Sequence, residues 1–102
     1  MYNMEQKKKV IKIIKAGKGL DVGYDDVYFL VDVRPNSNGY MEVNLTSNVL
    51  FAMMFNDNET HEMLSGVVSF VKSVIRNNII YGRYDGRVSD YKIEVATLNL
   101  SI

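Results

Sequence analysis

The sequence predicts a single α+β domain, residues 1–102, built of two packed helix-strand-strand units with an antiparallel sheet. Three observations lead to this prediction. Two stretches have helical periodicity, the stretches that follow them alternate apolar and polar residues, and the two halves of the chain resemble each other. The 102 residues, 47% of them apolar and 24% charged, have the size and composition of one ordinary globular domain.

The first unit is expected to begin with a helix over about residues 4–16. Asn3 and Gln6 have the spacing of a capping box, and Gly17 and Gly19 provide a stop signal. A β-strand over residues 10–14 is the alternative. In the helical interpretation, apolar and basic residues lie on opposite faces, with Val10, Ile13 and Ile14 on one face and Lys8, Lys12 and Lys15 on the other.

A β-hairpin over residues 27–46 is expected to complete the first unit. Residues 35–39 have the chemistry of a turn, because Pro35 fixes φ and Gly39 accepts positive φ. The residues on either side alternate with the period of a strand. This alternation predicts one face with Val27, Phe29, Val31 and Val33, an opposite face with Tyr28, Leu30, Asp32 and Arg34, and a returning strand with Met41, Val43 and Leu45.

The second unit begins with the clearest helical pattern of the chain. Six apolar residues form a stripe that would face a core, namely Leu64, Val67, Val68, Val71, Val74 and Ile75. Residues 56–58 supply candidate caps, and Asn77 and Asn78 are expected to end the helix. Strands over residues 79–84 and 87–100 would follow, joined by the turn pair Asp85–Gly86, with a β-bulge near Val95.

An internal duplication would explain this order of elements. Tyr24 and Asp25 align with Tyr84 and Asp85 at an offset of 60 residues. The predicted units are residues 1–48 and 56–102, joined by an apolar connector, residues 49–55, which could form a short helical turn, although periodicity alone does not settle its type. Two such units would pack face to face and leave a groove between them. Chance similarity between strand-rich segments is the alternative.

The residues indicate a binding protein and not an enzyme. The chain has no cysteine, a single histidine, no nucleophile-elbow pattern and no glycine-rich phosphate loop. The carboxylates around His61, at positions 57, 59 and 62, are explained by the start of a helix, where acidic side chains cap the backbone and complement its dipole. We therefore expect no catalytic residues, no metal and no cofactor.

A protein or peptide partner is the leading expectation, for a chain that is a monomer or a homodimer. Seven tyrosines and six methionines favour it, because tyrosine offers a large contact area and methionine adapts its shape. The expected partner-binding residues are the connector side chains and four tyrosines: Phe51, Met53, Met54, Phe55, Tyr24, Tyr28, Tyr81 and Tyr84. The alternative for the connector side chains is simple core packing.

Nucleic-acid binding is the second expectation. The first 20 residues hold six lysines against one glutamate, and the basic face of Lys8, Lys12 and Lys15 would contact phosphates. The remainder of the chain holds six basic against eleven acidic residues and would repel a polyanion. The longest apolar run covers seven residues, far fewer than the roughly 20 that span a bilayer. We expect a soluble intracellular protein with no membrane contact.

In overall character the chain resembles small uncharacterised proteins of the filamentous viruses of hyperthermophilic archaea, of the Acidianus filamentous virus type. The likeness covers residues 1–102 and lies in their short length, the lack of cysteine and the abundance of Lys, Ile, Val, Tyr and Asn. No motif carries it. The resemblance implies a viral protein located in the host cytoplasm and assigns no catalytic residue.

Overall fold

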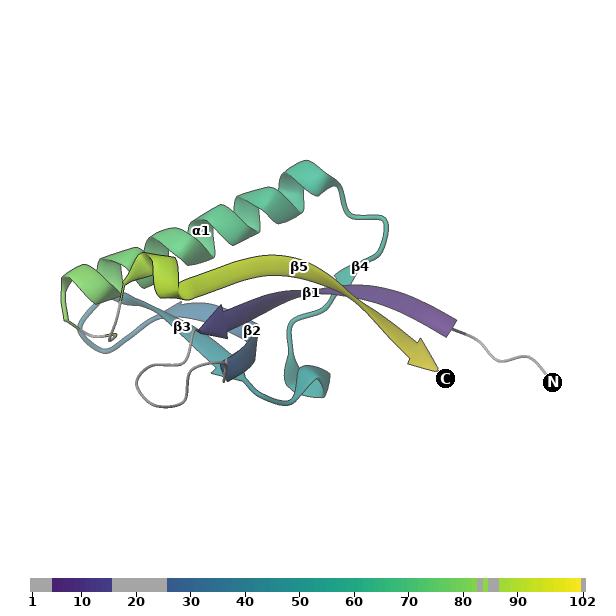
Figure 1. Ribbon diagram of the computed structural model, residues 1–102, viewed down its shortest axis with the longest axis horizontal. Helices are drawn as coiled ribbons and strands as arrows, with labels where there is room; N and C mark the ends of the chain where they lie inside the picture. Colours follow the sequence, from purple (N-terminus) through teal and green to yellow (C-terminus); the bar gives the residue numbers. More distant parts are fainter. Residues whose placement is uncertain (1–4, 16–25, 83, 85–86, 102) are drawn as a thin grey trace.

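The computed structural model describes residues 5–15, 26–82, 84 and 87–101. In this part of the chain a five-stranded antiparallel sheet carries one long helix on one face, so the predicted α+β character is confirmed (Figure 1). The elements in chain order are β1 (Glu5–Lys15), β2 (Asp26–Pro35), β3 (Met41–Thr46), the 3₁₀ turn η1 (Val49–Phe51), β4 (Phe55–Asn56), α1 (His61–Ile80), the 3₁₀ turn η2 (Val88–Asp90) and β5 (Tyr91–Ser101).

The central strand of the sheet is β1. Along one side it pairs with β5 over its whole length, from Glu5 opposite Ser101 to Lys15 opposite Tyr91. Along its other side it pairs first with the short β4 and then, through residues 12–15, with β2. β3 pairs with β2 and lies beyond it. The two long outer strands of the sheet are therefore β3 and β5.

The predicted helix over residues 4–16 is wrong, and the strand alternative for residues 10–14 is confirmed by β1. Ile11 and Ile13 pack in the core beneath α1. Val10 points to the opposite face and is also buried, with 1% exposure. A central strand that is covered on both faces has consecutive apolar residues, and over five positions these resemble one face of a helix. The pairing of β1 with three other strands outweighs that local pattern.

The predicted hairpin over residues 27–46 is confirmed by β2 and β3, but the strict alternation along the first strand is not. The register shifts between Leu30 and Asp32, which makes Val31 the extra residue of a β-bulge. Because of this bulge, Leu30 and Val33 both pack against the core, although a regular strand would place them on opposite faces.

The predicted apolar stripe of the second helix is confirmed by α1, whose residues Leu64, Val71, Val74 and Ile75 are buried. The helix begins later than expected, because the Thr60 hydroxyl accepts the Met63 N–H as its cap. It also continues past Asn77 and Asn78 to Ile80, so the predicted helix end is wrong. Ile79 packs against the core one turn beyond Ile75 and so continues the apolar stripe into this last turn.

The predicted strand over residues 87–100 is confirmed from Tyr91 onward by β5, but the hairpin with a strand over residues 79–84 is wrong. Ile79 and Ile80 belong to α1, and β5 pairs with the first strand of the chain. Asp85 and Gly86 lie outside the described residues. The register of β5 against β1 is continuous from Tyr91 to Ser101, so the bulge expected near Val95 is absent, and the described bulge is the one in β2.

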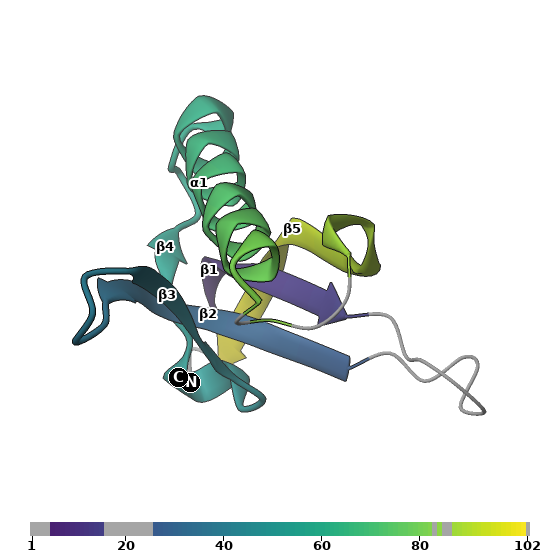
Figure 2. The same cartoon turned by 90° about the vertical axis from the view of Figure 1, so that its left-hand side faces the viewer.

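Within the described residues there is one helix, so the expected pair of packed helix-strand-strand units, and with it the groove between them, is not found. The connector begins with η1, which confirms the expected helical turn over residues 49–51, and ends at Phe55, the first residue of β4. Figures 1 and 2 show α1 above the sheet and η1 below it. The buried residues beneath α1 form the main core, which β1, β2, β3 and α1 supply.

Candidate functional site

A groove runs along the outer edge of β5, beneath the flank of α1. One section, of about 550 Å³, lies between the first half of the helix and Ile93, Glu94 and Val95. A second section, of about 710 Å³, lies between the second half of the helix and Tyr91, Lys92 and Ile93. Val68 and Ile93 line both sections. We call this channel, formed by residues 61–76 of α1 and 89–95 around the start of β5, the edge groove.

The floor and the helical wall of the edge groove differ in chemistry. Leu64, Val68 and Ile93 give it an apolar floor. The helical wall is polar and consists of side chains three or four positions apart, which places them on one side of α1: His61, Ser65, Ser69, Lys72 and Arg76. The hydroxyl of Ser65 lies 3.3 Å from Nε2 of His61.

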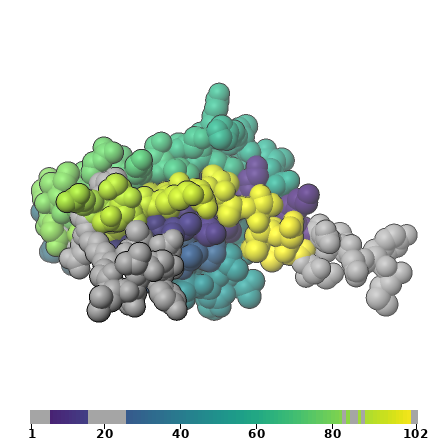
Figure 3. Space-filling view, in the orientation of Figure 1, coloured from purple at the N-terminus to yellow at the C-terminus, as the bar shows by residue number. Residues whose placement is uncertain are grey.

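The outer edge of β5 borders this groove. Among the described strands only β1 pairs with β5, so its other edge presents the main-chain N–H and C=O groups of alternate residues. Figure 3 shows β5 along the surface of this side of the molecule with α1 directly above it. Proteins usually blunt such edges with proline, bulges or charges. β5 has neither a proline nor a bulge, and its only charged side chains are Lys92 and Glu94, which pair with each other at 3.5 Å.

The outer edge of the other outer strand, β3, is partly occupied by side-chain hydrogen bonds. The Asn78 side chain donates from Nδ2 to the main-chain carbonyl of Met41 at 2.9 Å. The Tyr84 hydroxyl accepts the Val43 N–H at 3.3 Å. Asn78, near the end of α1, and Tyr84, beyond it, thus bind edge groups of β3. No described side chain forms such a hydrogen bond with residues 92–100 of β5. Among the described residues, this contrast favours the β5 edge over the β3 edge for pairing with a further strand.

The connector residues predicted to bind a partner do not lie in the edge groove. Phe51 is 70% exposed in η1, on the face of the sheet opposite α1, and Met53 is partly exposed next to it. Phe55 packs against the core beneath α1 and pairs with Lys9, while Met54 is half-buried. The predicted group of four is therefore divided between the surface and the core.

The four tyrosines are also separated. Tyr28 and Tyr84 line a cavity of about 300 Å³ together with Tyr91 and Ile13, near the end of β1. Tyr81 lies elsewhere, 6.0 Å from the ring of Tyr40, at a pocket of about 250 Å³ beside Phe70 and Met41. Tyr24 lies outside the described residues.

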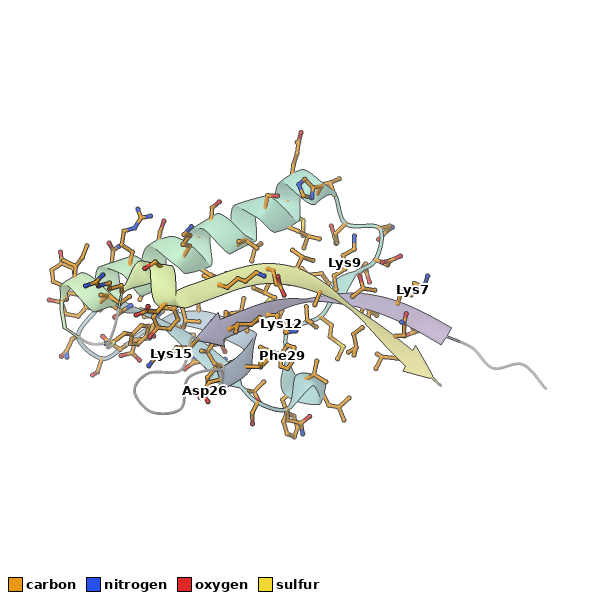
Figure 4. All side chains as sticks on the ribbon, in the orientation of Figure 1. Lys7, Lys9, Lys12, Lys15, Asp26 and Phe29 are labelled. Carbon is orange, nitrogen blue, oxygen red and sulfur yellow. The ribbon has the colours of Figure 1, made fainter. Side chains whose placement is uncertain are left out.

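The predicted basic face of Lys8, Lys12 and Lys15 is wrong, because these residues belong to a strand. By alternation Lys8 and Lys12 project from the face opposite α1, whereas Lys15 projects from the α1 face, with Nζ 5.7 Å from the Tyr91 ring centroid. Lys8 donates a hydrogen bond to Asn56 Oδ1 at 3.0 Å. Figure 4 shows the lysines spread along β1, with Lys7 and Lys9 toward one end and Lys12 and Lys15 toward the other.

Neither a metal cluster nor a spanning helix is present in the described part of the chain. No three His, Asp or Glu side chains there gather closely enough to hold a metal ion. The described helices also lack the combination of length and apolar character that crossing a bilayer requires.

The sequence did not predict the residues of the edge groove, and the reason is physical. The groove depends on β5 being an outer strand, and this follows from its pairing with β1, at the opposite end of the sequence. The available signal was the polar line from His61 through Ser65 and Ser69 to Lys72 and Arg76, which runs beside the apolar stripe of the helix. An ordinary solvent-exposed helix face has the same pattern of polar residues, so this line alone does not indicate a groove.

No protein-family model, no curated protein and no solved structure matches this chain.

Proposed function

We propose that this protein is an interaction module that binds an extended peptide of a partner protein as an additional strand along β5. The observation that carries the proposal is the outer edge of β5, which no described strand pairs with and which borders the edge groove. The main chain of β5 supplies hydrogen bonds to the peptide, and every second peptide side chain enters the groove. The groove takes the place of the inter-repeat groove expected from the sequence.

Most of the affinity and all of the selectivity must come from the groove side chains. The part of β5 that borders the groove is short, and each main-chain hydrogen bond contributes only about 1 kcal/mol net. Burying one valine- or leucine-sized side chain contributes about 1.5–3 kcal/mol. Val68 lines both groove sections, so its side chain contacts the peptide near its centre.

The test uses peptides selected from displayed random libraries on the purified wild-type chain. The best binder is synthesised with a fluorescent label, and its Kd is measured by anisotropy. Because Val68→Glu puts a charge on the apolar floor, we expect it to weaken binding at least about tenfold. A second readout is a set of peptides each N-methylated at one position, in which affinity should fall only at alternate positions, as an added strand requires.

Two matched controls interpret the result. Phe51→Glu introduces the same charge on the opposite face of the sheet and should leave the Kd unchanged. Circular dichroism and thermal unfolding of both variants check the fold. Equal weakening by both variants, uniform sensitivity to N-methylation, or no selected peptide would each contradict the proposal.

Nucleic-acid binding has less structural support, because the lysines on which it depended project from two faces of β1. Salt-sensitive binding of an oligonucleotide, lost in a Lys8→Glu/Lys12→Glu/Lys15→Glu variant, would revive it. On the resemblance to filamentous-virus proteins, we propose the host cytoplasm as the compartment of the peptide interaction.

A further inference from the structure

The two ends of the edge groove differ in charge. At the end near Tyr91, the groove is lined by Lys72 and Arg76. Both side chains are exposed, and neither forms a salt bridge with another residue in the described ranges. The opposite section is lined by one basic and one acidic residue, Lys9 and Glu94, and Glu94 forms its ion pair with Lys92. The end of the groove near Tyr91 therefore holds two basic side chains that form no ion pair with a described residue.

We propose that the edge groove binds the free C-terminal segment of a partner protein, antiparallel to β5, with its α-carboxylate between Lys72 and Arg76. This inference rests on the proposed function and adds the direction of the peptide and the chemistry of its end. Lys72 and Arg76 are four positions apart on α1 and project from the same side of the helix. Together they offer a carboxylate two charge-assisted hydrogen-bond partners.

The direction follows from the course of β5. This strand starts at Tyr91, at the basic end of the groove, and runs away from it toward Ser101. A peptide antiparallel to β5 therefore has its C-terminal end at Lys72 and Arg76. A parallel peptide would place a positively charged N-terminus or an interior residue there, with no negative charge to pair with the two cations.

The groove is also closed at that end, which favours a chain terminus over an interior acidic residue. The turn η2 immediately precedes β5 and contacts α1 (Figure 1). It is braced internally, because the Asp90 carboxylate accepts the Arg87 N–H at 2.8 Å and the Asp90 N–H donates to the Arg87 carbonyl at 2.9 Å. Strand pairing along β5 cannot continue past Tyr91, so an added strand must end or turn away at this point.

The groove also defines which peptide side chains are selected. Ile93 and Val95 share the α1 face of β5, and peptide residues opposite them face the groove. If the terminal peptide residue lies opposite Tyr91, the peptide residues opposite Ile93 and Val95 are the third and the fifth from the C-terminal end. We expect apolar side chains at both positions and no preference at the positions between them.

The experiment compares two random heptapeptide libraries, one displayed with free C-termini and one fused at both ends. Only the first should yield binders. The best binder is then synthesised with a free carboxylate and with a C-terminal carboxamide, and both are titrated against the wild-type chain. The carboxamide should bind about tenfold more weakly, the effect expected of a partly exposed ion pair with two cations.

A matched pair of variants assigns that loss to the basic end. Lys72→Gln/Arg76→Gln should bind the carboxylate and carboxamide peptides equally. Lys12→Gln/Arg34→Gln removes the same amount of charge away from the groove, from Lys12 on the face of β1 opposite α1 and from Arg34 near the end of β2. This variant should keep the tenfold preference for the carboxylate peptide.

The outcomes separate this inference from the proposed function. Equal binding of the carboxylate and the carboxamide to the wild-type chain, a preference that persists in Lys72→Gln/Arg76→Gln, or enrichment of internal acidic peptides would overturn the inference. The proposed function would stand in these cases if Val68→Glu still weakened binding at least about tenfold. Enrichment of no peptide from either library would overturn both.

Discussion

Asn78, near the end of α1, donates from Nδ2 to the main-chain carbonyl of Met41 on the outer edge of β3, at 2.9 Å. The same amide group donates to the Val74 carbonyl one helical turn earlier, at 2.8 Å, and the side chain is 2% exposed. Its Oδ1 atom is buried and accepts no hydrogen bond from the described residues. Two acceptors for the amino group fix the orientation of the amide. Asn78 therefore binds the helix to the sheet edge through its amino group alone.

Replacing Asn78 should destabilise the fold. Asn78→Ala leaves the Met41 carbonyl without its side-chain donor, which destabilises the fold. Alanine also has a higher helix propensity and removes the buried, unpaired Oδ1, but these two gains are smaller than the loss. We expect the free energy of unfolding to fall by about 1–2 kcal/mol. Urea denaturation measures this change. Asn77→Ala, at the exposed neighbouring position, is the control and should not lower stability; equal losses in the two variants would contradict the role of Asn78.

Tyr84 should protect one specific backbone amide. Its hydroxyl accepts the Val43 N–H at 3.3 Å, from a position well away in the sequence. Tyr84→Phe keeps the ring and removes the acceptor, so hydrogen exchange at the Val43 amide should accelerate, with a loss of stability of about 0.5–1 kcal/mol. Exchange monitored by NMR resolves this amide. Tyr28→Phe changes another tyrosine of the same cavity and should leave Val43 exchange unaltered.

The core beneath α1 and the surface of η1 should respond very differently to truncation. Ile75 is 1% exposed within the core, so Ile75→Ala should cost about 2–5 kcal/mol. Phe51 is 70% exposed, so Phe51→Ser should change stability by less than about 0.5 kcal/mol. Thermal or urea unfolding distinguishes these values. A large loss of stability in Phe51→Ser would show that Phe51 packs in a core, which is the alternative that the sequence left open for the connector side chains.

These contrasts show which features of the fold were predictable. The apolar stripe of α1 extends over many residues and is unambiguous, and the alternation on both sides of the turn at Pro35 indicates a hairpin. The pattern of apolar and basic residues over positions 10–14 is too short to distinguish a helix from a strand. The interaction that decides between them is the pairing of β1 with β5. The Val31 bulge and the side-chain contact of Tyr84 with β3 also have no local sequence signal.

The candidate site was less predictable than the fold. Tyrosine, methionine and phenylalanine are useful at an interface and in a core alike, so their abundance indicated binding without locating it. The structure divides them among η1, the core and two separate pockets. The edge groove depends instead on which strand is outermost and which helix flank lies above it, and both are properties of the tertiary arrangement.

The last prediction concerns the amides of β5 in the free protein. Alternate residues of this strand point their N–H groups toward β1 and toward the open edge, so hydrogen exchange should alternate between slow and fast along residues 92–95. By contrast, residues 12–15 of β1 are paired on both sides, and their amides should exchange uniformly slowly. NMR-detected exchange tests both patterns. Addition of a selected peptide should slow the fast amides of residues 92–95 and leave residues 12–15 unchanged. Uniform protection of β5 before any peptide is added would mean that its edge is already covered, and the groove could not then receive an added strand.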